Sequence, residues 1–279
     1  MTATRSHTVD RADAPDLHVV ETGPSDARPI LLVHGYSQSH LSWRDQFDST
    51  LAEEFRLVAM DLRGHGESEK PRGAYGESEA WAGDVQAVAD ALGLDEFVLA
   101  GWSYGSLVAL DYLATHGTDR VAAVALVGVV AGIGTKTTNE WLQPEYLDLF
   151  PDLVSTDAET ATAALAAFVD VCFHAERPPD ERYLDLGFNA VVPPHVRDGM
   201  RDRTVSHLDL LGELSVPVLV THGAHDRVVS AEAARAVADR IPDAELSVYP
   251  DCGHTPFREN AERFGRELRA FVRSLESGP

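Results

Sequence analysis

The sequence predicts an α/β fold built around a parallel sheet, with a helical insertion between two of the core strands. Short apolar runs alternate along the chain with longer segments of helical pattern, as in successive βαβ units. The runs are rich in Val and Leu and are bounded by Gly, Pro or Asp, which is typical of buried parallel strands. The alternation stops between about residues 132 and 214, where no strand is predicted.

Each predicted element follows from its local pattern. Seven apolar runs are predicted to be strands, namely Leu17–Glu21, Ile30–Val33, Arg56–Met60, Glu96–Ala100, Val121–Val127, Val216–Val220 and Glu245–Tyr249. Helices are predicted over Glu77–Leu92, Ser106–Thr115, Ala231–Arg240 and Pro256–Leu275, and Gly or Pro closes the first three. In the insertion, the Ala-rich stretch Asp157–Phe173 has a helical pattern. The chain therefore divides into a first core part (1–131), the helical insertion (132–214) and a second core part (215–279).

The charge balance excludes some classes of partner. The chain has 279 residues, with 45 Asp and Glu against 23 Lys and Arg, which makes the formal net charge −22. A field of this sign repels phosphate backbones and anionic membrane surfaces, so neither nucleic acid nor a membrane is an expected partner. The acids are spread along the chain, and the lysines are Lys70 and Lys136 alone. This pattern resembles proteins of salt-loving archaea. A GC-rich genome would explain the preference for Arg but not the excess of acids.

Apolar segments long enough to cross a bilayer are absent from the sequence. The longest apolar stretch, Val121–Ile133, has about 13 residues, which is short of the roughly 18–20 that a spanning helix needs. The segment Met1–Asp10 lacks the basic and apolar regions of a secretion signal. A cytoplasmic location is therefore expected.

The strongest local signal for chemistry is Gly-Trp-Ser-Tyr-Gly at residues 101–105. It follows a predicted strand and precedes a predicted helix. In that context the G-x-S-x-G pattern places a serine, here Ser103, on a sharp turn above the edge of the sheet. The flanking glycines are expected because a larger side chain would clash at so tight a turn. The free N–H groups at the start of the following helix favour a developing negative charge.

A serine hydroxyl needs a base, and the base needs an orienting carboxylate. His254 lies in the loop between the last predicted strand and the last predicted helix, and Asp226 follows the strand before it. All three side chains come after the carboxyl ends of strands, where open α/β sheets place their sites. The order along the chain is Ser, Asp, His. The loop after Val121–Val127 offers no carboxylate that could replace Asp226.

Together these motifs resemble the α/β-hydrolase fold superfamily. Two further motifs contribute, His-Gly-Tyr at residues 34–36 after an early strand and Asp-Leu-Arg-Gly-His-Gly-Glu-Ser at residues 61–68 after the next. The sequence is most similar to the cap-bearing group, which holds cofactor-free haloperoxidases, small-ester esterases, enol-lactone hydrolases and C–C bond hydrolases. The resemblance implies a mostly parallel eight-stranded sheet with helices on both faces, and it implies that the insertion at residues 132–214 is a helical cap.

The same resemblance implies a role for each site residue. Ser103 matches the nucleophile, Asp226 the acid and His254 the base. The backbone N–H groups of Tyr36 and Tyr104 match the oxyanion hole. His34 and His65 match structural positions, ordering the oxyanion loop and the Gly-rich turn respectively.

The predicted function is that of a serine hydrolase, carboxylesterase-like, acting on a small or medium ester, lactone or related acyl substrate with water. Serine at the turn argues against haloalkane dehalogenases and epoxide hydrolases, which use Asp there. C–C bond hydrolysis and haloperoxidase activity through perhydrolysis stay open as alternatives, and so does a ligand-binding signalling receptor that retains the triad. No metal and no cofactor are expected, because metal-ligand, Walker and G-x-G-x-x-G motifs are absent from the sequence. The sequence carries no signal for an oligomeric state.

The insertion is the expected source of the substrate pocket. Its large aromatic side chains either line that pocket or pack within the insertion, and packing is the favoured interpretation. They are Trp141, Phe150, Phe168, Phe173 and Phe188.

Overall fold

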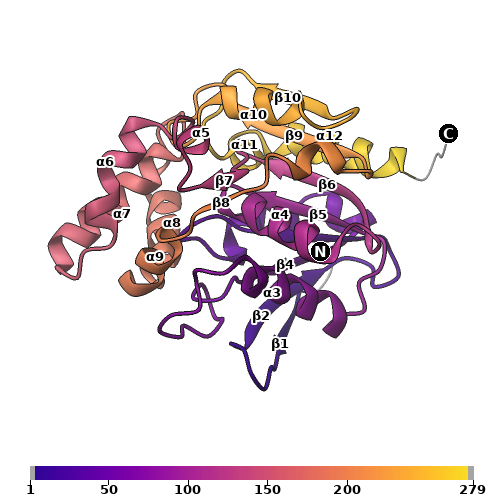
Figure 1. The fold of residues 1–279 in the computed structure, drawn as a ribbon, viewed down its shortest axis with the longest axis horizontal. Coiled ribbons are helices and arrows are strands. Elements are labelled where there is room, and N and C mark those ends of the chain that lie inside the picture. Colours follow the sequence, from indigo (N-terminus) through magenta and orange to yellow (C-terminus); the bar gives the residue numbers. More distant parts are fainter. Residues whose placement is uncertain (1–3, 276–279) are drawn as a thin grey trace.

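The large sheet of the molecule has eight strands. The computed structural model describes residues 4–275. Residues 1–3 and 276–279 lie outside the described residues, and the first three belong to the segment that is predicted to lack a secretion signal. The strands are β1 (Arg5–Val9), β2 (Leu17–Thr22), β3 (Pro29–Val33), β4 (Arg56–Met60), β5 (Phe97–Trp102), β6 (Val121–Val127), β9 (Val218–Gly223) and β10 (Glu245–Tyr249). Their spatial order is β1-β2-β4-β3-β5-β6-β9-β10, and Figure 1 shows them as one twisted sheet.

The sheet is mostly parallel, as predicted. Strands β4, β3, β5, β6, β9 and β10 run parallel, while β2 pairs antiparallel with both β1 and β4. The edge strand β1 was not predicted. Its sequence, Arg-Ser-His-Thr-Val, has one buried residue at its end, so it lacks the apolar run by which the other strands were recognised. Hydrogen bonding to β2 holds this segment as an extended strand, although its own residue pattern does not predict one.

Helices cover both faces of the sheet. On one face, α3 (Ser78–Ala91), α4 (Tyr104–His116) and α10 (Ala231–Ala238) pack on alternate strand residues such as Leu31 and Val33. On the other face, α12 (Ala261–Ser274) packs on the intervening residues, such as Ile30 and Leu32. The short elements 3-10 helix His40–Trp43, α1 (Arg44–Phe47), α2 (Leu51–Glu54) and α11 (Pro256–Glu259) complete that second layer.

The predicted boundaries differ from the structure at three informative points, which are the end of β5, the start of α4 and a break within the last predicted helix. Strand β5 continues to Trp102 and α4 begins at Tyr104, so Ser103 is the single residue between them. The segment predicted as one helix, Pro256–Leu275, is broken at Asn260, whose backbone leaves the helical region with φ −138°. The Asn260 side chain accepts a hydrogen bond from the Arg263 amide and so caps a new helix.

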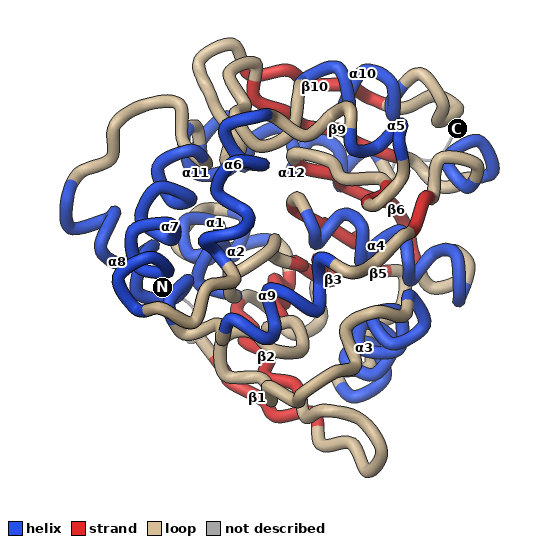
Figure 2. Tube along the Cα trace, turned by 60° about the vertical axis from the view of Figure 1, so that its left-hand side comes forward, coloured by secondary structure: helices blue, strands red, loops and turns tan. Residues whose placement is uncertain are grey.

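The segment between β6 and β9 is mainly helical. It comprises β7 (Gly132–Ile133), α5 (Lys136–Asn139), α6 (Pro144–Leu153), α7 (Ala158–Val171), α8 (Pro179–Ala190), α9 (Pro194–Arg201), β8 (Val205–Ser206) and the 3-10 helix Leu210–Glu213. The predicted helix over Asp157–Phe173 corresponds to α7, with Asp157 as its N-cap. Figure 1 shows α6 to α9 grouped together on the left of the molecule, and Figure 2 shows the same segment from another side. The two-residue strands β7 and β8, which were not predicted, pair where the segment leaves and rejoins the core.

Two buried ion-pair clusters attach this helical segment to the rest of the fold. Arg203, which follows α9, binds both carboxylate oxygens of Asp111 in α4, at 2.9 and 2.7 Å. Asp185 of α8 accepts from Arg258 of α11 at 2.7 Å and from Arg44 of α1 at 3.2 Å. Breaking a buried pair of this kind costs roughly 3–5 kcal/mol, so the segment has a defined position on the core. Within residues 4–275 no helix combines the length and apolar composition needed to cross a bilayer.

Candidate active site

Ser103 occupies a strained turn between β5 and α4. Its backbone has φ 55° and ψ −120°, and its amide donates to the Val127 carbonyl at 2.8 Å. The flanking glycines are required by close packing, as predicted. A Cβ on Gly101 would lie 2.4 Å from the Gly105 carbonyl oxygen, and a Cβ on Gly105 would lie 2.2 Å from that of Val33. Such strain persists only where the surrounding structure enforces it, and it clusters at functional sites.

Asp226 is a buried carboxylate, and each of its two oxygens has two nitrogen atoms within 3.0 Å. Its Oδ1 accepts from the amides of Val228 and Val229, at 2.7 and 2.9 Å. Its Oδ2 lies 2.7 Å from Nδ1 of His254 and 3.0 Å from Nε2 of His222. Burial alone would raise the pKa of this carboxyl. The positive character of His254 and the hydrogen bonds from both imidazoles outweigh burial and hold the pKa of Asp226 well below its usual range.

His254 is held in place from two sides. Its amide donates to the Cys172 carbonyl at the end of α7, at 2.9 Å, and its carbonyl accepts from Nε1 of Trp102 at 2.8 Å. The Trp102 and His254 rings also contact each other, with 5.6 Å between their centroids. Because Trp102 directly precedes Ser103, its side chain links the loop that carries His254 (the histidine loop) to the turn that carries Ser103.

The structure thus joins Asp226 to His254 directly and brings Ser103 to the same end of the sheet. The Val127 carbonyl binds the Ser103 amide, and a Cβ on the next residue, Gly128, would lie 3.0 Å from the His254 ring. Among the described residues the Ser103 hydroxyl forms no hydrogen bond with the imidazole. In enzymes without substrate such contacts are often long and tighten when substrate binds.

The two predicted oxyanion-hole amides border Ser103. Tyr104 is the first residue of α4, and Gly35, just before Tyr36, is so near that a Cβ on it would lie 3.1 Å from the Ser103 Cβ. In the described part of the chain neither the Tyr36 nor the Tyr104 N–H has a hydrogen-bond acceptor. Two unpaired amides beside a serine hydroxyl are the donors that an oxyanion needs.

Two buried histidines order the loop that carries Tyr36. Nδ1 of His34 donates to the Gly35 carbonyl at 2.8 Å, and its Nε2 accepts from the Leu62 amide at 3.0 Å. Nδ1 of His65 donates to the Arg63 carbonyl at 2.9 Å. Burial lowers the pKa of His34 to about 4 and that of His65 to about 3, so both rings are neutral at pH 7. The structural roles expected for them agree with these bonds.

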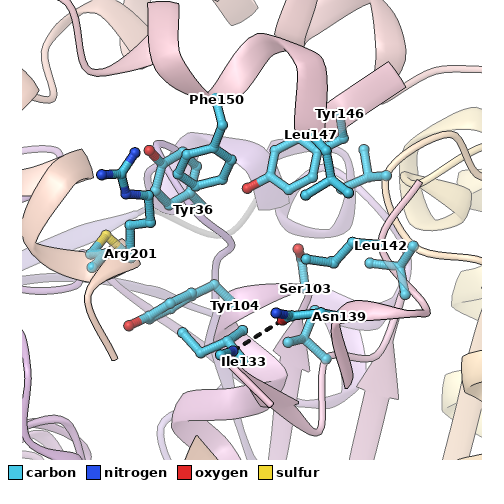
Figure 3. A pocket seen from close by; sticks show the side chains of 15 residues that line it. Tyr36, Ser103, Tyr104, Ile133, Asn139, Leu142, Tyr146, Leu147, Phe150 and Arg201 are labelled. Carbon is cyan, nitrogen blue, oxygen red and sulfur yellow. Dashed lines mark hydrogen bonds between the residues drawn. The ribbon is translucent and has the colours of Figure 1, made fainter. Parts of the chain in front are cut away.

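A mainly apolar cavity of about 300 Å³ opens at Ser103. Figure 3 shows the serine hydroxyl on one side, with Tyr146, Leu147 and Phe150 of α6 opposite it and Arg201 at the far end. The other lining residues are Tyr36, Tyr104, Val130, Ile133, Gly134, Asn139, Leu142, Met200, Val228 and Val229. Of the five Trp and Phe residues of the insertion, Phe150 lines the cavity, Phe168, Phe173 and Phe188 are buried by packing, and Trp141 is partly buried against the core.

The described residues include one group with the ligand types of a metal site, which the sequence reasoning missed. It consists of His18, His40 and Asp61, whose ligand atoms lie within 4.8 Å of one another. These atoms already bond one another, since both imidazole Nδ1 atoms lie 3.0 Å from Asp61 carboxylate oxygens. Asp61 also accepts from the amides of His40 and Glu67. Despite its burial, the two histidines hold the pKa of Asp61 well below its usual range, and the hydrogen bond to Asp61 raises the pKa of His18. The group is thus explained as a hydrogen-bonded cluster that orders the turn after β4.

Comparison with known proteins decides the family. The family model described as alpha/beta hydrolase fold matches residues 28–261. The chain belongs to this family. The fold predicted by resemblance is therefore confirmed.

The relatives of this alpha/beta hydrolase have several related activities. It is 30% identical to the bifunctional esterase/perhydrolase of Acinetobacter calcoaceticus, over 95% of this chain and 99% of that protein. It is 28% identical to 2-hydroxymuconate semialdehyde hydrolase of Pseudomonas putida, over 89% and 88% of the two chains. Among solved structures, an esterase from Rhodococcus sp. ECU1013 matches with a TM-score of 0.90 and 38% identity, covering 99% of this chain and all of that one. Like these relatives, this alpha/beta hydrolase is an enzyme.

Proposed function

We propose that this alpha/beta hydrolase cleaves a small or medium ester, lactone or related acyl compound through Ser103, His254 and Asp226. The observation that carries the proposal is the 2.7 Å bond between Nδ1 of His254 and the buried Asp226 carboxylate, beside a strained serine that faces an apolar cavity. This arrangement orients an imidazole as a base next to a hydroxyl, which is the requirement for activating a serine nucleophile.

The proposed reaction has two stages. Nε2 of His254 takes the Ser103 proton while the serine oxygen attacks the acyl carbonyl carbon, and the amides of Tyr36 and Tyr104 bind the resulting oxyanion. His254 then returns the proton to the departing alcohol, which leaves an acyl-enzyme. Water attacks this ester with His254 as the base again, and the acid and free Ser103 are released. Asp226 holds the imidazole in the required tautomer and stabilises its charged form.

The size and lining of the cavity support a small acyl substrate. A volume of about 300 Å³ lies at the lower end of the range for small-molecule sites. We assign residues 132–214 as the cap over this site, because α6 and α9 supply the wall opposite the serine. The relative that is a bifunctional esterase/perhydrolase favours perhydrolysis as a second candidate activity, since peroxide in place of water would accept the acyl group from the same intermediate.

A panel of p-nitrophenyl esters tests the proposal. We expect rapid multiple turnover, with the highest kcat/KM for short and medium acyl chains and a steep fall for palmitate, because a long chain exceeds the cavity. A single burst without turnover across the panel would instead favour a ligand-binding receptor that retains the triad.

Repeating the panel with hydrogen peroxide measures perhydrolysis. Repeating it in dilute buffer and in molar KCl tests the halophilic character that the composition predicts.

The pH dependence should report the imidazole and not the carboxyl. The pKa of Asp226 is lowered in the folded state, so this carboxyl stays ionised far below neutral pH. Its contribution to folding stability is complete above the unfolded-state pKa of 3.8 and is lost as the pH falls below that value. We therefore expect kcat/KM to fall on acidification above about pH 4 with the fold intact, because a protonated imidazole is no longer a base. Stopped assays with circular dichroism at each pH separate the two effects. A kcat/KM that is flat between about pH 4 and 8 would contradict the proposed base.

A further inference from the structure

We propose that His222 is a positioning residue of this site, which donates its Nε2–H to the Asp226 carboxylate and so limits how strongly that carboxylate stabilises protonated His254. The inference rests on the proposed function of Asp226 and His254. His222 is the next-to-last residue of β9 and lies four residues before Asp226. Its side chain is fully buried, and it belongs to none of the sequence motifs that predict the site.

The hydrogen bonds of His222 determine which of its nitrogens carries the proton. Nε2 lies 3.0 Å from the Val229 carbonyl oxygen and 3.0 Å from Oδ2 of Asp226. Both are acceptors, so Nε2 carries the hydrogen: it donates to the Val229 carbonyl and also lies within ion-pair distance of the Asp226 carboxylate. Nδ1 is buried and has no partner among the described residues. The geometry therefore assigns the Nε2–H tautomer.

This donor completes the environment of the carboxylate. Oδ1 of Asp226 is used by the two amides of the following turn, which leaves Oδ2 to be shared between His254 and His222. Because His222 bonds the Val229 carbonyl and lies 3.0 Å from Oδ2 of Asp226, it also links the strand to the far end of that turn. The carboxylate is thereby prevented from rotating, and Oδ2 stays directed at Nδ1 of His254.

The second donor has an electrostatic consequence with a definite sign. A hydrogen bond to the ionised carboxylate reduces the negative charge that Oδ2 presents to His254. Without it, the attraction between Asp226 and protonated His254 is stronger, so the imidazole should hold its proton to higher pH. The other titratable and charged groups near the site keep their side chains in a His222 variant. They are Cys172, whose carbonyl accepts from the His254 amide, Glu259 in α11, which accepts from the Gly253 amide, and Arg227, which follows Asp226.

The test compares His222→Leu, which removes the donor, with His222→Gln, whose side-chain amide nitrogen reaches about as far as Nε2. For His222→Leu we expect the acid limb of the kcat/KM profile to move to higher pH by roughly 0.5–1 unit. We also expect kcat to fall about tenfold, by analogy with the loss of a group that orients a metal-ligating histidine, because Asp226 would be held less firmly toward His254. His222→Gln should restore both. The matched control is His225→Leu. His225 is an exposed imidazole in the loop that carries Asp226 and stacks on His174, and its replacement should leave the acid limb in place.

Three results would overturn the inference: an unmoved acid limb in His222→Leu, a His222→Gln variant no better than His222→Leu, or a shift of the same size in His225→Leu. A measurement on the unaltered chain does not depend on variant stability. In ¹⁵N-histidine-labelled protein, the resonances lost in His222→Gln should show a ring protonated at Nε2, and protonation at Nδ1 would contradict the assignment. If Ser103 reacts with a fluorophosphonate but the His222 results fail, this inference is wrong and the proposed function stands. If Ser103 fails to react, the proposed function itself is wrong.

Discussion

Replacing Ser103 by alanine should lower kcat for ester hydrolysis by about 10⁴-fold or more. The hydroxyl is the proposed attacking group, and among the described residues that line the cavity no other is a serine, threonine or cysteine. Alanine has the same backbone freedom as serine, so the strained turn with φ 55° should form equally well in the variant. The measurement is the initial rate with the best p-nitrophenyl ester of the panel, at saturating substrate.

Two controls make this result interpretable. An unchanged Tm and circular dichroism spectrum would show that the variant is folded. A fluorophosphonate probe should label the wild-type chain at residue 103 by mass spectrometry and should leave Ser103→Ala unlabelled. Hydrolysis by a folded Ser103→Ala variant at the wild-type rate would exclude the acyl-enzyme mechanism.

Replacing Asp226 by asparagine should lower kcat about 10⁴-fold while the fold is kept. The amide oxygen of asparagine can still accept from the Val228 and Val229 amides, which directs its NH₂ group to the position of Oδ2. In the unaltered chain Oδ2 lies 2.7 Å from Nδ1 of His254 and accepts its hydrogen bond. In the variant an NH₂ donor faces Nδ1 instead. The imidazole must then turn or adopt the other tautomer, in which Nε2 carries a proton and cannot accept one from Ser103.

The matched control is Asp251→Asn, which removes one carboxylate from the exposed start of the histidine loop. We expect its kcat to stay within about twofold of wild type, because an exposed charge is screened by solvent. Equal losses in the two variants would mean that net charge, and not the orientation of His254, controls the rate. A kcat near the wild-type value in Asp226→Asn would remove Asp226 from the proposed mechanism.

The pattern of residues along the chain was sufficient for the class of fold, and it also led to the proposed triad. Strands such as Ile30–Val33 and Val121–Val127 are buried on both faces, so their composition alone distinguishes them. The Gly-Trp-Ser-Tyr-Gly turn is equally local, because the glycines are required by contacts within that turn and with the adjacent strand β3. The residues Asp226 and His254 were found because each follows a strand end that belongs to the same edge of the sheet.

The tertiary structure alone decided the features that depend on partners distant in sequence. The edge strand β1 forms because β2 offers it hydrogen bonds, and the break at Asn260 arises where a side-chain cap replaces helical continuation. The role of His222 depends on the fold of the turn at residues 226–229, and the cavity depends on α6 and α9 lying over the serine. Local sequence determines what a segment prefers, but a hydrogen bond or a cavity wall between separate segments exists only when the whole chain brings them within a few ångströms.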